Sequence, residues 1–289
     1  MKLSCVTATF NCIKSGNRDR LIRCVESVAK LTTEHEHLIY DGASTDGTFE
    51  VLRELAANTP GLKVFSEPDT GIYNALNKGV RDAKGEWFYV LGADDYISHP
   101  QVMDSIINAA DRATNVIITS VERDGKIMEW FTADNIWRTL VSMPHSHQGM
   151  LIRTNDCRGY KGYDERFKIC ADYDMLLKAH KSALRFQYLY EPFAEFSPGG
   201  VSSNSYEETD KDFMSCRANF LGLSEGEKIF YDKYGHPPLR AIIPYLFHKD
   251  EALRCSSRYL LKKWLQHYIF PFALAAWLRR YIRNYIKGR

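Results

Sequence analysis

The chain has 289 residues, of which 45% are hydrophobic and 26% charged, an ordinary globular composition that suffices for one large domain or a domain with an appendage. Its seven cysteines are scattered and form no C-x-x-C pair, which argues against a disulfide framework or a zinc site and favours a reducing cytosol. The net charge of +2 is uneven, because residues 252–289 hold nine Lys and Arg and no Asp or Glu, whereas the first 251 residues hold 29 basic and 36 acidic ones.

Strand-like and helix-like segments alternate through the first hundred residues and are joined by short links. The predicted strands are Leu3–Phe10, His37–Tyr40, Leu62–Ser66 and Glu86–Leu91, and the predicted helices are Arg18–Lys30, Phe49–Ala57 and Ile72–Ala83. This pattern is typical of a mostly parallel sheet covered by helices on both faces. In such sheets, ligands bind beyond the carboxyl ends of the strands.

Polar side chains stand at or just after these strand ends: Asn11, Asp41, Asp69, Asp94 and Asp95. Their convergence on one edge of the sheet indicates a binding site rather than solvated loops. The adjacent Asp94 and Asp95 repel each other, which is tolerable if a divalent cation binds there. Mg²⁺ in proteins is typically held by one or two carboxylates together with phosphate oxygens and water.

The sequence contains no G-x-G-x-x-G and no G-x-x-x-x-G-K-[ST] motif. Their absence argues against a dinucleotide-binding fold and against a P-loop, in which glycine-rich loops hold the phosphates. A site without such a loop can bind a diphosphate through a metal ion instead.

Several motifs occur in a characteristic order. "TATFN", "DGASTDGT", "EPDTGIYNALNKG" and "VLGADDY" are followed by "HQGMLIR" and "ADYDMLLK". Together they resemble the family 2 glycosyltransferases, in particular the bacterial polysaccharide and O-antigen branch, over roughly the first 200 residues. The resemblance implies the Rossmann-like GT-A fold, an α/β fold with a mostly parallel sheet flanked by helices.

The domain organisation follows from this resemblance and from the composition. We expect a GT-A catalytic domain over residues 1–205, with a nucleotide-sugar half at 1–100 and an acceptor half at 101–205. A helical C-terminal region, rich in basic and aromatic residues, is expected over 206–289. Its membrane-associating tail is predicted to begin near residue 244.

The resemblance implies roles for residues at the nucleotide-binding end of the sheet. Thr7 and Asn11 would lie in the first nucleotide-binding loop, and Asp41 would read the base of the donor, most simply uracil. Asp69 would border the nucleotide and let the following glycine turn tightly. Lys78 could approach the phosphates, although a solvated lysine fits the sequence about as well.

The pair Asp94–Asp95 matches the acidic motif that the family usually carries as D-x-D. Gly92 stands where many members have the first Asp or an Asn. The resemblance implies that Asp95 is the direct ligand of Mg²⁺ or Mn²⁺ and that Asp94 faces the ribose or sugar of the donor.

Glycosyl transfer with inversion also requires a base for the acceptor hydroxyl. Asp172 in "CADYDML" matches the position of the family's catalytic Asp, with Ala171 in place of the usual Glu. Asp174 is the alternative base and a candidate for the pocket, but it could also cap a helix at Met175–Lys181. Both acids could instead merely begin that helix.

Further pocket residues are expected in two segments. His145 and His147 would share a face if they lie on a strand, as metal ligands or as ordinary hydrogen-bonded histidines. The resemblance favours His147 and Gln148 in the donor or acceptor pocket. Gly199 and Gly200 in "FSPGGVSSNS" belong to a loop that could close over the diphosphate or the acceptor, or that is a plain linker.

The tail combines aromatic, aliphatic and basic residues. Its uncharged run Tyr268–Leu278 contains Pro271 and is too short to span a bilayer, which takes about 20 residues. A basic amphipathic pair of helices on an anionic membrane surface fits this pattern. A helical cap packed on the enzyme, an oligomer contact and an RNA-binding patch are the alternatives. No nucleic-acid partner is expected, since no nucleic-acid module precedes the tail.

The sequence thus predicts a metal-dependent inverting glycosyltransferase that transfers a hexosyl or N-acetylhexosaminyl group from a nucleotide sugar, with a UDP-sugar favoured. A lipid-linked saccharide of cell-surface polysaccharide or lipopolysaccharide synthesis is the expected acceptor. The protein is expected to be cytoplasmic and peripheral on the inner face of the cytoplasmic membrane, with homo-oligomerisation left open. The alternatives are a nucleotide-sugar-binding membrane adaptor, which would not need a base, and a nucleotidyltransferase, which normally has a basic glycine-rich loop.

Overall fold

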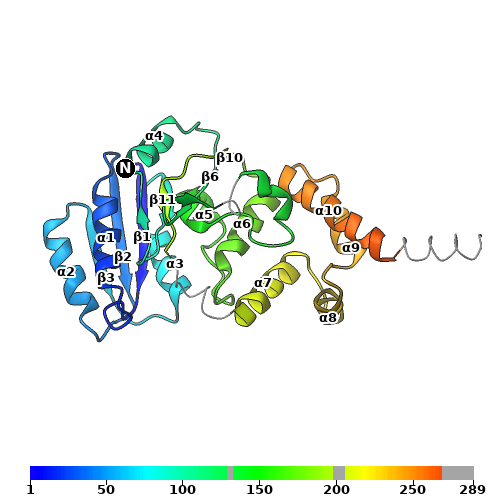
Figure 1. The fold of residues 1–289 in the computed structure, drawn as a ribbon, viewed down its shortest axis with the longest axis horizontal. Helices are drawn as coiled ribbons and strands as arrows, with labels where there is room; N and C mark the ends of the chain where they lie inside the picture. The colour runs from blue at the N-terminus through cyan, green and yellow to red at the C-terminus, as the bar shows by residue number, and fades with distance from the viewer. Residues whose placement is uncertain (129–132, 198–205, 269–289) are drawn as a thin grey trace, which may run out of the picture.

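A seven-stranded sheet forms the centre of the molecule (Figure 1). The computed structural model describes residues 1–128, 133–197 and 206–268. The strand order is β10–β6–β9–β4–β1–β2–β3, and the bounds are β1 (Leu3–Thr9), β2 (His35–Asp41), β3 (Leu62–Ser66), β4 (Trp87–Val90), β6 (Val116–Thr119), β9 (Met150–Arg153) and β10 (Phe186–Leu189). Only β9 is antiparallel to its neighbours, β4 and β6. The predicted mostly parallel sheet is therefore confirmed.

Burial on both faces explains why central strands such as β1 and β4 do not alternate between apolar and polar residues. In β1, Leu3 and Cys5 pack into the hydrophobic cluster on one face, whereas Val6 packs into the cluster on the other. Near-continuous apolar strands of this kind are typical of parallel sheets covered on both sides.

Helices cover both faces of the sheet (Figure 1). Apolar side chains of α1 (Arg18–Ala29), α2 (Thr48–Asn58) and α4 (Pro100–Ala109) pack on one face. Those of α3 (Ile72–Asp82), α5 (Thr154–Gly159) and α6 (Ala171–Lys181) pack on the other face. The elements predicted in the first hundred residues end within two residues of the observed bounds.

Helix α6 begins earlier than the sequence predicts. It starts at Ala171 rather than Met175, so Asp172 and Asp174 lie within its first turn rather than before it. Acidic side chains are favourable there, because the positive end of the helix dipole lies at the amino terminus.

A second, four-stranded sheet has the order β5–β11–β7–β8. Its strands are β5 (Tyr96–Ile97), β7 (Glu122–Arg123), β8 (Lys126–Ile127) and β11 (Ala194–Glu195). Strand β11 pairs with β5, which directly follows the acidic pair. This pairing brings the chain around Ser197 next to the loop that carries Asp95.

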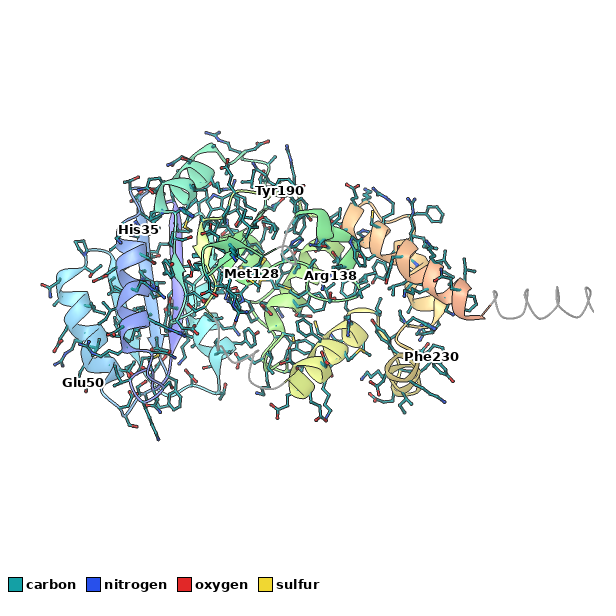
Figure 2. The ribbon with its side chains drawn as sticks, in the orientation of Figure 1. His35, Glu50, Met128, Arg138, Tyr190 and Phe230 are labelled. Atoms are coloured by element: carbon teal, nitrogen blue, oxygen red, sulfur yellow. The ribbon has the colours of Figure 1, made fainter. Side chains whose placement is uncertain are left out.

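The C-terminal helices extend the core on the α6 side of the sheet (Figure 1). They are α7 (Tyr206–Phe220), α8 (Glu225–Tyr234), α9 (Leu239–Ile242) and α10 (Glu251–Tyr268), and the 3₁₀ turn η5 (Ile243–Tyr245) precedes α10. Buried side chains from these helices belong to the same hydrophobic cluster as those of α6. Figure 2 places Glu50 of α2 and Phe230 of α8 at opposite ends of the molecule.

The first part of the tail, which was predicted to begin near residue 244, lies within the described residues. Tyr245, Leu253 and Leu260 are buried, so the chain packs on the protein well into α10. The rest of the tail, residues 269–289, lies outside the described residues. In the described part of the chain, none of the helices combines the length and the apolar character that crossing a membrane requires.

The close packing of α3 on β1 gives a stability prediction. A Cβ at Gly79 would lie 2.4 Å from Cγ1 of the buried Val6, so Gly79→Ala should lower the free energy of unfolding by about 1–3 kcal/mol through overpacking. In the matched control, Gly226→Ala in α8, a Cβ would meet no described atom within 4 Å. The control should be neutral or stabilising by up to about 1 kcal/mol. Urea unfolding of both variants is the measurement, and equal losses would contradict the packing argument.

Candidate functional site

The acidic loop follows β4 at the carboxyl edge of the sheet. Asp95 is only 3% exposed, and its two oxygens accept hydrogen bonds of 2.7 Å, Oδ1 from the Ser197 N–H and Oδ2 from Gln148 Nε2. Burial and then the charge of Asp94 raise the pKa of Asp95. A Cβ at Gly92 would lie 2.5 Å from Asp95 Oδ2, so the Asp95 carboxylate fills the space beside the glycine.

This geometry bears on which carboxylate can meet a cation. Asp94 is partly exposed, whereas both oxygens of Asp95 are engaged within the protein. Within this pair, the Asp94 carboxylate is therefore the one that is open to solvent. In the described part of the chain, no three His, Cys, Asp or Glu side chains form a metal site. A divalent cation bound here would thus take further ligands from phosphate and water, as Mg²⁺ usually does.

Asn11 connects the loop after β1 to the turn after β2. Its Oδ1 accepts a hydrogen bond from the Thr45 N–H at 3.0 Å, and its own N–H donates to Ser44 Oγ at 2.8 Å. Asn11 has a φ of 49°, a left-handed conformation that asparagine tolerates better than most residues. Asn11 thereby fixes the two loops against each other at the sheet edge that is predicted to bind the nucleotide.

Asp41 is the last residue of β2 and is almost fully buried. Its carboxylate accepts hydrogen bonds from Thr9 Oγ1 at 3.1 Å, from the Ser44 N–H at 2.9 Å and from Ser66 Oγ at 2.7 Å. These contacts join the ends of β1, β2 and β3. The described arrangement thus uses Asp41 to hold the strand ends rather than to present a carboxylate to a base.

Asp69 and Phe10 both lie close to Gly42. Asp69 Oδ1 accepts from the Gly71 N–H at 2.9 Å, and Asp69 Oδ2 lies 2.8 Å from where a Cβ of Gly42 would be. A ring carbon of Phe10 lies 3.3 Å from the same point, and the side chain is 64% exposed. Phe10 was not among the residues predicted for the site, although its position directly after a buried strand and next to Asn11 is a signal for an exposed aromatic residue at the sheet edge.

Two other residues predicted for the nucleotide site have internal partners. Thr7 lies inside β1 rather than in the loop after it, where its hydroxyl contacts His37 Nε2 and donates to the Leu91 carbonyl, both at 2.9 Å. Lys78 forms an ion pair with Glu67 at 2.9 Å. The structure therefore places both side chains in supporting contacts near the site.

Asp172, the candidate base, projects from the first turn of α6 and is 19% exposed. Its Oδ1 accepts from the Tyr173 N–H at 2.8 Å and lies 3.5 Å from the Tyr73 hydroxyl, which donates its proton to the Ile169 carbonyl at 2.5 Å. Its Oδ2 lies 3.3 Å from Nδ1 of His147. The candidate base and His147 are therefore in direct contact.

The carboxylates of Asp172, Asp95 and Asp94 all raise the pKa of His147. Burial alone would lower its pKa, but the hydrogen bond and the charge of Asp172, followed by the charges of Asp95 and Asp94, raise it. His147 thus responds electrostatically both to the candidate base and to the acidic loop.

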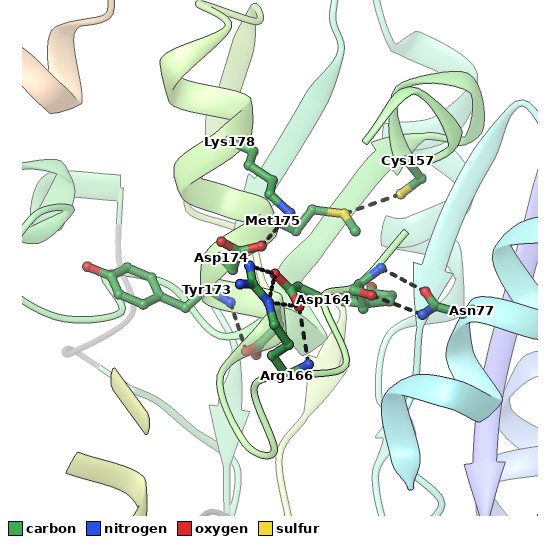
Figure 3. Close-up of polar contacts among 10 residues, drawn as sticks. Asn77, Cys157, Asp164, Arg166, Tyr173, Asp174, Met175 and Lys178 are labelled. Carbon is green, nitrogen blue, oxygen red and sulfur yellow. Dashed lines mark hydrogen bonds and ion pairs between the residues drawn. The ribbon is translucent and has the colours of Figure 1, made fainter. Parts of the chain in front are cut away.

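Asp174 points into the protein. It is buried and forms an ion pair of 2.6 Å with Lys178. Figure 3 shows it beside Lys178 and the Asp164–Arg166 pair. Burial is the largest influence on Asp174 and raises its pKa, although Lys178 acts in the opposite direction. This position fits a structural carboxylate better than a residue of the pocket or a base.

The two histidines of "PHSHQG" do not share a strand face. The 3₁₀ turn η3 (His147–Gly149) begins at His147, whereas His145 is buried and its ring lies 5.5 Å from that of Tyr188. Burial lowers the pKa of His145 to about 3. Gly199 and Gly200 lie outside the described residues.

The family described as "Glycosyl transferase family 2" has a sequence model that matches residues 4–172 of this chain. A protein of Mycobacterium tuberculosis named "PGL/p-HBAD biosynthesis glycosyltransferase" is 26% identical over 196 residues, which cover 66% of this chain and 76% of that protein. The chondroitin synthase of Pasteurella multocida is 30% identical over 166 residues, 54% of this chain but 17% of the synthase.

Two solved structures resemble the whole described fold. S. aureus TarS 1–349 in complex with UDP-GlcNAc has a TM-score of 0.63 at 18% identity, with 92% of each chain covered. The mannosyltransferase PcManGT from Pyrobaculum calidifontis, in complex with GDP-Man and Mn²⁺, has a TM-score of 0.56 at 16% identity, with 97% of this chain and 80% of that chain covered. Both likenesses concern the fold, and they extend through the C-terminal helices.

Proposed function

Because the chain belongs to glycosyl transferase family 2 and is thus a glycosyltransferase, we propose that it is a metal-dependent inverting enzyme that transfers one sugar from a nucleotide diphosphate sugar to an acceptor hydroxyl. The observation that carries the proposal is that Asp172 and Asp95 each contact a residue of the same turn, η3. His147 contacts Asp172, and the next residue, Gln148, contacts Asp95. A donor-side carboxylate and a base thus share one edge of the sheet.

The donor is a nucleotide sugar, and we favour a UDP-sugar. TarS and PcManGT have been solved with UDP-GlcNAc and GDP-Man, respectively, which supports this class of donor. In this chain, the exposed ring of Phe10 can stack on a base beside Gly42, and Asp69 can accept a hydrogen bond from a uracil N–H. Asn11 and Asp41 support this surface from below.

Asp94 would hold a Mg²⁺ or Mn²⁺ ion. The neighbouring Asp95 would keep its hydrogen bonds to Gln148 and Ser197. Such an ion supplies positive charge for the leaving diphosphate. The chemical class of the ligand fits, because Mg²⁺ and Mn²⁺ favour carboxylate oxygens. Mn²⁺ in the PcManGT structure supports the assignment by analogy of fold.

Asp172 would take the proton of the acceptor hydroxyl. As the hydroxyl oxygen bonds to the anomeric carbon, the bond from that carbon to the diphosphate oxygen breaks, and the electron pair leaves with the nucleoside diphosphate. The proton passes to the Asp172 carboxylate. A single displacement of this kind inverts the anomeric centre, and its transition state resembles an oxocarbenium ion.

A lipid-linked saccharide of cell-surface polysaccharide synthesis is our proposal for the acceptor. The cations of the tail support it, since Arg258, Lys262 and Lys263 are exposed on α10 and residues 269–289 add five Lys and Arg without an acid. An anionic inner membrane surface would attract this tail and bring the enzyme to its acceptor.

The transferase proposal predicts metal-dependent release of nucleoside diphosphate. Purified enzyme is incubated with a panel of UDP- and GDP-sugars, Mn²⁺ and detergent-solubilised lipid-linked saccharides. One donor should give acceptor-dependent release that EDTA abolishes and added Mn²⁺ restores. Asp94→Asn should weaken the response to Mn²⁺ more than Asp95→Asn does. Full turnover in EDTA would overturn the metal-dependent mechanism.

The two acids of α6 provide a matched pair of variants. Asp172→Asn should lower kcat by roughly 10²–10⁴-fold, because the acceptor loses its base, with the KM for the donor almost unchanged. Asp174→Asn should keep kcat but unfold at a lower temperature, since it loses the buried partner of Lys178. Steady-state kinetics and thermal melts separate the two effects, and the opposite pattern would make Asp174 the base.

The membrane proposal is tested by truncation after Tyr268, because an earlier cut would remove the buried residues of α10. The full chain should co-sediment with phosphatidylglycerol vesicles at low salt, and the truncated chain should bind on the order of tenfold or more weakly, given about 1 kcal/mol for each basic residue near an anionic surface. Neutral phosphatidylcholine vesicles and high salt are the controls. Equal binding of both chains would assign the residues after Tyr268 another role.

A further inference from the structure

One short turn contacts both sides of the site. In η3, His147 Nδ1 lies 3.3 Å from Asp172 Oδ2, and Gln148 Nε2 donates to Asp95 Oδ2 at 2.7 Å. These neighbouring residues thus reach a carboxylate on α6 and a carboxylate after β4. The turn is therefore in contact with both acids.

Two hydrogen bonds and one close backbone approach fix the conformation of this turn. The Tyr89 hydroxyl donates to the Gln148 carbonyl at 2.9 Å, and the Ser146 hydroxyl donates to Gln148 Oε1. With Oε1 held in this way, the amide presents Nε2 to Asp95. A Cβ at Gly149 would lie 2.5 Å from the Thr119 carbonyl, so the backbone of the turn sits directly against β6.

The side chain of His147 is less enclosed than that of Gln148. It is 34% exposed, whereas Gln148 is buried. A substitution at His147 can therefore remove the contact with Asp172 without opening a hole in the core. A carboxylate oxygen has two lone pairs, so Asp172 Oδ2 can accept from His147 and still receive a proton from an acceptor.

We propose that His147 is a positioning residue for Asp172, and that Gln148 anchors its turn to Asp95, so that the turn sets the spacing between the acidic loop and the base. This inference rests on the proposed function. The orientation of Asp172 in the first turn of α6 would then depend on a donor from a different segment. Displacement of a reacting group by about 1 Å can cost 10²-fold in rate.

The test compares two substitutions of similar size. In His147→Asn the amide nitrogen stands near the position of the imidazole Nδ1, whereas His147→Leu has no donor. With the donor sugar identified by the panel, His147→Leu should lower kcat by about 10–100-fold, with the KM for the donor within about twofold of wild type. His147→Asn should recover most of this loss, and both should melt near the wild-type temperature.

The anchoring role of Gln148 adds a second measurement. Gln148→Met keeps the volume but loses both amide contacts, and it should also lower kcat. Because both residues act through one turn, the double variant His147→Leu/Gln148→Met should be within about threefold of the slower single variant. Losses that multiply would show independent roles and overturn the shared anchor.

Other outcomes distinguish a failure of the proposed function from a failure of the positioning role of His147. An inactive wild type with every donor would reject the proposed function. An active wild type with an equally active His147→Leu, or with equal losses in the Leu and Asn variants, would reject positioning of Asp172. If Mn²⁺ binding, measured by calorimetry with UDP, were lost in His147→Leu, His147 would be a metal ligand instead.

Discussion

The burial of Asp95 is the constraint on which the site depends. A carboxylate removed from water is costly unless donors replace the lost hydration, and here the replacements come from Gln148 and from the backbone of Ser197. Each donor lies in a different segment, one leading into β9 and one following β11. The acidic loop is thus held by contacts that only the complete fold can assemble. Asp94, the neighbouring acid, is left at the surface of the same loop.

Much of the fold was predictable from the first hundred residues, because the strands carry apolar runs such as those of β1 and β4 and the helices show a regular apolar face. The middle of the chain was harder. Strand β9 has only four residues, too few for a periodicity to appear, and it reverses direction between two parallel neighbours. Its position depends on long-range packing that no local pattern records.

The same distinction applies to the site. The edge of the sheet, the acidic loop and Asp172 could be identified because strand ends and motif order are local features. Whether a carboxylate faces solvent or the interior is not local. Asp41 and Asp172 look alike as acids at predicted positions, but the first holds three strand ends together, whereas the second is partly exposed beside His147. Phe10 was overlooked for a related reason, since an aromatic residue is usually assigned to a core.

The glycine at position 92 restricts which substitutions the chain can accept. Its missing side chain makes room for the Asp95 carboxylate, so a side chain introduced at position 92 would displace that carboxylate. The two positions are therefore epistatic, and a change at one is tolerated only with a rearrangement at the other.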